Sequence, residues 1–175
     1  METSTNPNVS AFVGRLARAR DRIGPGGVAA LRRGTGRAVG DPAAAAQAFF
    51  SLHPPDGVKL EPASWTAATL WARHELHSGD AGSYGASLGQ LARRNDAAAG
   101  RLLARLLASD REEMPSALRR SITLLREHSI SIDYVKLTWD LAKWSGDERD
   151  VQRTWARDFY RTSRPSSDHP HPTED

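Results

Sequence analysis

Basic side chains recur at helical spacing in three successive segments of the chain. Residues that lie four or seven positions apart share one face of an α-helix, so each segment predicts a basic ridge pointing away from its apolar face. If the three ridges point the same way, they form a groove that binds phosphates by Coulomb attraction and counterion release. The ridge residues are Arg101 and Arg105, then Arg119, Arg120 and Arg126, and finally Lys136 and Lys143.

A fourth concentration of basic residues lies near the start of the sequence. Between Phe12 and Gly40 there are seven arginines against a single acid, Asp21, although the net charge of the whole chain is only +3. Arginine predominates over lysine, and its planar guanidinium suits bidentate contacts with phosphate. The alternative is that the arginines reflect a genome rich in G and C and that the ridges are ordinary solvated helix faces.

Segments that could support catalysis or bind a metal depart from the motifs they resemble. His74 and His77 are three residues apart, whereas a zinc-binding helix needs two histidines four apart; we therefore expect packing or surface histidines. The glycines of residues 34–40 follow no predicted strand, so this segment is expected to be a mobile linker and not a phosphate-binding loop. His169 and His171 lie in the terminal tail. We predict no metal, no cofactor and no enzymatic activity.

The composition is that of an ordinary globular protein. The 175 residues are 39% hydrophobic and 26% charged, and they include no cysteine, which excludes disulfides and thiol chemistry. No apolar run approaches the roughly 18 residues of a membrane span, and the N-terminal residues lack the features of a signal peptide. We therefore expect a cytoplasmic protein that does not contact a membrane.

Apolar periodicity predicts an all-α fold of about eight helices in two small lobes. Asp133 is expected to cap one of the helices, and Ser64 another. Trp144 and Trp155 lie on apolar stripes and are assigned to the core, whereas Trp139 is off the stripe and can face the other lobe or a partner. The expected helices cover residues 9–23, 27–33, 41–52, 64–76, 88–94, 96–107, 115–125, 133–144 and 151–159.

The glycine-rich segment 78–87 holds no apolar run and is expected to be a loop that separates the two lobes. The predicted organisation is a flexible N-terminus over residues 1–8, an N-terminal helical lobe over 9–86, a C-terminal helical lobe over 87–162, and a disordered tail over 163–175.

Several short segments, in this order and spacing, resemble one known family, the small subunit (CasB) of the type I-E CRISPR Cascade surveillance complex. The resemblance covers roughly Phe12 to Arg161, and it is carried most clearly by the C-terminal part of the chain. One departure is Leu102, where the family pattern leads us to expect an aromatic residue. The segments are Ala30-Leu-Arg-Arg33, Arg101-Leu-Leu-Ala-Arg-Leu-Leu107, Leu118-Arg-Arg-Ser-Ile-Thr-Leu-Leu125, Ile132-Asp-Tyr134, Asp140-Leu-Ala-Lys-Trp144 and Trp155-Ala-Arg-Asp-Phe-Tyr160.

The resemblance implies an all-helical, non-catalytic subunit present in two copies beside the large and backbone subunits of Cascade. Such a subunit helps to hold the guide RNA and target strand and steadies the displaced DNA strand of the R-loop, without reading base sequence. No function is carried over to residues 34–89. The phosphate-contacting positions that the resemblance implies are Arg32, Arg33, Arg101, Arg105, Arg119 and Arg120; periodicity alone adds Arg126, Lys136 and Lys143.

Two other hypotheses belong to different classes. The chain could be a helical adaptor whose basic faces meet acidic protein surfaces, without direct contact to nucleic acid. A hydrolase using His74, His77 or His128 is the weaker alternative, because no nucleophile or paired carboxylate can be argued from position.

Overall fold

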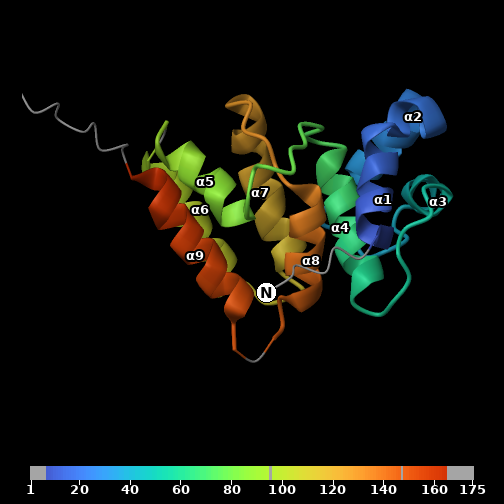
Figure 1. The fold of residues 1–175 in the computed structure, drawn as a ribbon. Coiled ribbons are helices and arrows are strands. Elements are labelled where there is room, and N and C mark those ends of the chain that lie inside the picture. Colours follow the sequence, from blue (N-terminus) through green and yellow to red (C-terminus); the bar gives the residue numbers. More distant parts are fainter. Residues whose placement is uncertain (1–6, 95, 147, 165–175) are drawn as a thin grey trace, which may run out of the picture.

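The computed structural model describes residues 7–94, 96–146 and 148–164, and within these ranges the chain forms nine helices (Figure 1). The predicted all-α fold class is confirmed. The expected flexible N-terminus and disordered tail lie almost wholly outside the described residues. The helices are α1 (Pro7–Ala17), α2 (Ala19–Arg33), α3 (Ala43–Ser51), α4 (Leu60–Trp71), α5 (Tyr84–Ala92), α6 (Asp96–Ala108), α7 (Met114–Glu127), α8 (Tyr134–Lys143) and α9 (Asp150–Ser163).

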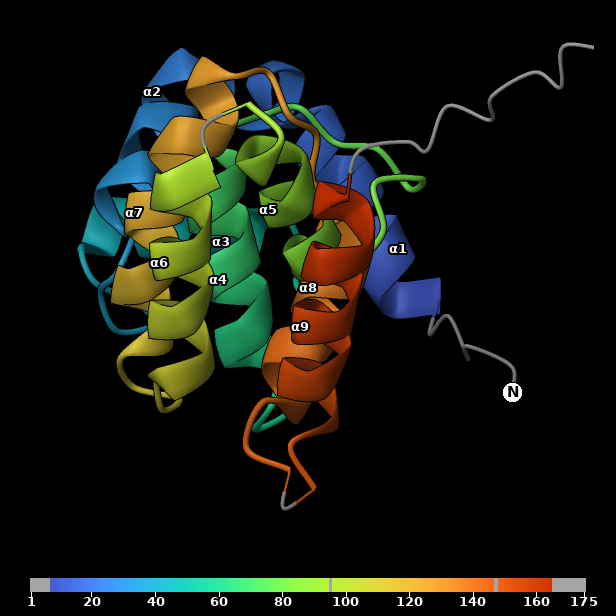
Figure 2. The same cartoon turned by 90° about the vertical axis from the view of Figure 1, so that its left-hand side faces the viewer.

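Helix α4 is the centre of the packing. Its residues 63–71 are all buried, because it contacts α1, α2, α7 and α8 on different sides. A helix that is apolar or small all round is one that lies inside a protein. Figure 2 shows α2, α6 and α7 on one side of α4 and α5, and α1, α8 and α9 on the other side.

Helices α5 and α9 form the closest pair, because α5 presents glycines to the backbone of α9. A Cβ atom at Gly85 would lie 2.1 Å from the Trp155 carbonyl oxygen, and one at Gly89 would lie 2.8 Å from that of Phe159. The prediction that residues 78–87 form a loop is wrong from Tyr84 onward, since α5 begins there and Ser83 accepts a capping hydrogen bond from the Ala86 amide. Of the three glycines that suggested a loop, Gly85 serves close helix packing, whereas Gly79 and Gly82 precede α5.

The buried side chains form one continuous core that includes residues from α1 through α9. Helix α8 packs on α4 and α1. The segment before α8 also bonds to the segment after α4. The His74 ring nitrogen lies 2.6 Å from the Ile130 carbonyl, and the Tyr134 hydroxyl donates to the His74 carbonyl. The Nδ1 atom of His77 lies 3.0 Å from the Ile132 carbonyl, so both histidines of the 74–77 segment pack as expected. The division into lobes at residues 86 and 87 stays a prediction.

The N-terminal helices differ from expectation in their breaks. The apolar pattern predicts a single helix over residues 9–23, but the chain leaves helical geometry at Arg18 (φ −109°, ψ 17°) and again at Gly24 (φ 65°, ψ 174°). The stop at Gly24 is thus confirmed as a kink, with helix resuming to Arg33. Positive φ is accessible to glycine without a Cβ penalty.

Two predictions for the fourth helix are wrong, and three others along the chain are confirmed. Ser64 lies within α4 and does not cap it, because the helix begins four residues earlier; Leu76 lies beyond its end and is 45% exposed. Asp133 does cap α8, accepting from the Lys136 amide at 3.0 Å. Trp144 and Trp155 are buried in the core.

No helix among the described residues is long and apolar enough to span a bilayer.

Candidate nucleic-acid interface

Six arginines from two helices, α2 and α7, and from the turns that follow α2 and α4 meet on one surface, which we call the arginine cluster. Arg32 and Arg33 end α2, Arg73 follows α4, and α7 supplies two residues that lie two turns apart. A surface depression is lined by Arg33, Arg37, Pro42, Arg73 and Arg119. The full cluster is Arg32, Arg33, Arg37, Arg73, Arg119 and Arg126.

Hydrogen bonds between the turn after α2 and the end of α4 position the cluster. Arg73 donates from Nε to the Thr35 hydroxyl at 2.8 Å, and Arg32 donates from Nε to the Ala72 carbonyl at 2.9 Å. The Thr35 hydroxyl lies 3.1 Å from the Thr69 carbonyl, and Trp65 donates to the Arg37 carbonyl at 3.0 Å. The expectation of a mobile linker is therefore wrong for residues 34–37, which are bonded to α4.

The close packing of this turn also explains one of its glycines. A Cβ atom at Gly34 would lie 2.9 Å from a ring carbon of Trp65 and 3.2 Å from the Thr69 methyl group. Only a residue without a side chain lets the turn approach α4 this closely. The turn is thus packed closely against α4, and Arg33 and Arg37 on either side of Gly34 line the same depression as Arg119 of α7.

Positive charge in the cluster is largely uncompensated. Burial lowers the pKa of the Arg73 guanidinium, and the positive charges of Arg119, Arg32 and Arg126 lower it further. Within the described ranges, only Arg37 of the cluster has a carboxylate partner, Asp41 at 3.1 Å. Arginine keeps its proton at physiological pH, so the mutual repulsion persists until an anion neutralises it.

Four of the predicted site residues belong to the cluster, and three more lie on helices that adjoin it. Arg105 lines a second depression together with Ser116 of α7, and Ser116 is also the residue that a Cβ atom at Gly36 would approach, at 3.6 Å. Arg101 and Arg120 are exposed on α6 and α7, which pack against each other. Figure 2 places α2, α6 and α7, the helices that carry these arginines, on one side of α4 and α5.

The two predicted lysines lie elsewhere. Lys136 and Lys143 belong to α8, and Figure 2 shows α4 between α7 and α8. Lys136 lies 3.9 Å from the Asp140 carboxylate, and the Lys143 ammonium lies 5.8 Å from the centroid of the Trp139 ring. They do not share a surface with the arginine cluster, so the three ridges do not form one groove. A nucleic-acid contact for these lysines stays a prediction.

Sequence reasoning missed Arg37 and Arg73 as site residues. Arg37 is one of the seven arginines between Phe12 and Gly40, so the local density of arginine was a usable signal. No local signal marks Arg73, because it follows the end of α4 and reaches the cluster only through its bonds to Thr35 and Arg32.

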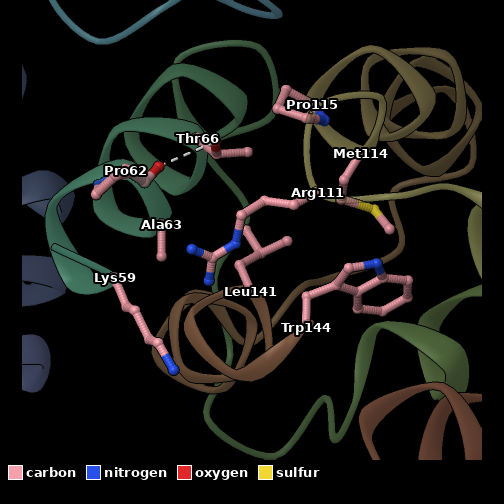
Figure 3. Close-up of a pocket in the computed structure, with 9 residues that line it drawn as sticks. All are labelled: Lys59, Pro62, Ala63, Thr66, Arg111, Met114, Pro115, Leu141 and Trp144. Carbon is pink, nitrogen blue, oxygen red and sulfur yellow. Dashed lines mark hydrogen bonds between the residues drawn. The ribbon is translucent and has the colours of Figure 1, made fainter. Parts of the chain in front are cut away.

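A pocket between α4, α7 and α8 is too small for an organic ligand (Figure 3). Its volume is about 80 Å³, and the Arg111 side chain extends into it beside Ala63 and Leu141 (Figure 3). Arg111 donates to the Ala142 carbonyl at 3.0 Å, which satisfies a carbonyl near the C-terminus of α8. Its role is structural. The described residues include no group of three or more side chains that could hold a metal ion.

The fold and this surface define a class: small all-α proteins that present a concentrated arginine surface. Comparison with known families identifies the particular one. The chain belongs to the CRISPR-associated protein Cse2 family, whose family model matches residues 27–160. This confirms the resemblance to the CasB small subunit, and the matched range contains every predicted site residue.

Relatives and solved structures agree with this assignment. A Cse2 protein of Thermus thermophilus is 38% identical over 55 residues, a stretch that spans 31% of this chain and 31% of that relative. The crystal structure of M. ruber CasB superposes with a TM-score of 0.73 at 27% identity, over 89% of this chain and 93% of the other. A chain of a CRISPR RNA-guided surveillance complex superposes with a TM-score of 0.74 at 27% identity, over 90% and 94%.

Proposed function

We propose that this protein is a non-catalytic subunit of a CRISPR RNA-guided surveillance complex and that its arginine cluster holds nucleic-acid backbones without reading base sequence. The observation that carries the proposal is the arginine cluster itself, six guanidiniums with one carboxylate partner in the described part of the chain. Membership of the Cse2 family and the likeness to a chain of a surveillance complex support the assembly. The setting is antiviral defence in the cytoplasm.

In this function the ligands are guide RNA, the target strand and the displaced strand of the R-loop. The protein partners are the large and backbone subunits of Cascade and a second copy of this chain. The guanidiniums of Arg32 and Arg73 are already held by hydrogen bonds, which suits phosphate contacts because less conformational entropy is lost when a ligand binds. Sequence information then comes from guide pairing, so the subunit needs no contact with base edges.

We expect the double substitution R119A/R126A to weaken binding of unrelated DNA and RNA alike. For a duplex, removal of each arginine–phosphate pair should reduce the slope of log affinity against log salt by roughly one unit. Fluorescence anisotropy of the purified chain with labelled duplex DNA, single-stranded DNA and RNA, across a salt series, measures both quantities.

The matched control is R18A/R22A, which removes two exposed arginines at the start of α2 that have no ion-pair partner in the described residues. An equal loss of affinity in R18A/R22A would show that binding depends only on net charge, which would contradict a specific role for the arginine cluster. No binding by the unaltered chain at low salt would favour the helical adaptor for acidic protein surfaces, whose partner a pull-down would then identify.

A further inference from the structure

Helix α9 carries a second basic surface, away from the arginine cluster. Its buried residues are Val151, Gln152, Trp155 and Phe159, and this face packs on α5. The opposite face holds exposed arginines at every fourth position, so they stack along the helix about 6 Å apart. We call it the α9 face; its residues are Arg153, Arg157, Tyr160 and Arg161, and Arg164 follows directly after the end of the helix.

The charges of the α9 face are mostly available to a ligand. The side chains of Arg153 and Arg161 are 64% and 73% exposed, and each pairs at 2.6 Å with the acid three residues earlier. Exposed pairs of this kind contribute little and exchange readily with other partners. Arg157 and Arg164 have no hydrogen-bond or ion-pair partner in the described ranges.

The acid beside Arg161 is itself engaged elsewhere. Asp158 is only 13% exposed, and its carboxylate accepts a hydrogen bond at 2.7 Å from Ser83, the N-cap of α5. It therefore serves the packing of α9 on α5 and projects little negative charge outward. Asp150 is 65% exposed and offsets part of the charge of Arg153, so the positive charge of this face is concentrated toward its C-terminal half, at Arg157 and Arg161.

An aromatic ring lies among these arginines. Tyr160 is 62% exposed, and the edge-to-face contact with the buried Phe159, 5.1 Å between ring centroids, supports it from below. A large exposed aromatic between cations is the combination that suits single-stranded nucleic acids, with bases stacking on the ring and phosphates on the guanidiniums. A base inside a duplex is already stacked on both sides and gains nothing from this ring.

We infer that the α9 face is a second nucleic-acid site, selective for a single strand. This rests on the proposed function, and it deepens that function by adding a site for a different strand. Both Figure 1 and Figure 2 place α9 away from α2, so a strand on this face does not compete with one on the arginine cluster.

The test compares single-stranded and duplex DNA by anisotropy, using Y160A, Y160F and R157A/R161A. Removal of one base stack lowers affinity about tenfold, so Y160A should weaken by that factor the single-strand binding that remains in an R119A/R126A background, and it should leave duplex binding unchanged. Y160F keeps the ring and should bind like the unaltered chain. R157A/R161A should weaken single-strand binding and reduce its salt slope.

The cluster variant R119A/R126A, measured beside these, separates the two proposals. Binding that is abolished in R119A/R126A but unchanged in Y160A and R157A/R161A overturns the α9 site and leaves the cluster standing. The reverse result overturns the cluster and supports the α9 site. Equal weakening of duplex and single-strand binding by Y160A contradicts strand selectivity. If R157A/R161A leaves binding of both nucleic acids unchanged but abolishes binding of an acidic protein in a pull-down, a nucleic-acid role for the α9 face is overturned.

Discussion

Replacing Gly85 with alanine should destabilise this protein more than the same substitution at any other glycine of its helices. The new Cβ would lie 2.1 Å from the carbonyl oxygen and 2.5 Å from the Cα of Trp155. Both atoms belong to the backbone of α9, so no side-chain rotation relieves the contact and the two helices must separate. Overpacking costs typically 1–3 kcal/mol even where side chains can adjust, so we expect the free energy of unfolding to fall by more than about 3 kcal/mol.

Urea unfolding followed by tryptophan fluorescence measures this destabilisation, because Trp144 and Trp155 lie at the α8–α9 junction with their ring centroids 4.9 Å apart. The matched control is G100A in α6, where a Cβ atom would meet nothing within 4 Å. There the substitution removes only the entropic disadvantage of glycine in a helix, and we expect stabilisation of about 0.5–1 kcal/mol. Equal midpoints for G85A and the unaltered chain would contradict the packing of α5 on α9.

The second large effect concerns a buried carboxylate. The fully buried Trp155 donates from Nε1 to Asp140 at 2.7 Å. Burial raises the pKa of Asp140, while the Trp155 bond and the charges of Lys136 and Lys143 oppose this rise, and Asp133 adds to it. Its folded pKa exceeds its unfolded value, so the folded state binds more protons between the two values. The contribution of Asp140 to stability is therefore greatest below this window and is lost as the pH rises through it.

We expect W155F to cost about 3 kcal/mol or more at pH 7, because it leaves a buried carboxylate without its donor and a void where the indole was. The cost should shrink on acidification, since a protonated Asp140 is less costly to bury. Thermal unfolding at a series of pH values measures this, and W155F/D140N should show less pH dependence than W155F alone.

W144F is the control for the pH dependence. Trp144 is also buried, but its Nε1 donates at 3.0 Å to a neutral acceptor, the Ser109 carbonyl. W144F should lower stability by a similar packing mechanism, with the same effect at each pH. A W155F effect that is likewise constant from about pH 4 to about pH 8 would show that Asp140 does not govern it.

Much of the secondary structure could be predicted from the sequence because its causes are local. Helical periodicity places Leu137 and Leu141 on one face, Asp133 accepts the amide three residues on, and the tryptophans at 144 and 155 fall on apolar stripes. The errors at Ser64 and Tyr84 have one origin. A buried helix tolerates serine and glycine internally when packing requires small residues, so residues typical of caps and loops do not have their usual meaning there.

The candidate site likewise has features that could be predicted from the sequence and features that depend on packing. Periodicity and motif order alone indicate that the helices are amphipathic, that α6 and α7 carry exposed arginines, and that the chain resembles one family. Which charges meet depends on how the helices pack: Arg73 donates a hydrogen bond to the Arg32 carbonyl across 41 residues, while α8, which carries Lys136 and Lys143, lies across α4 from α7. The reason is physical, because the 3.6-residue period sets where a side chain points around its own helix, whereas packing of one helix on another sets which helices share a face.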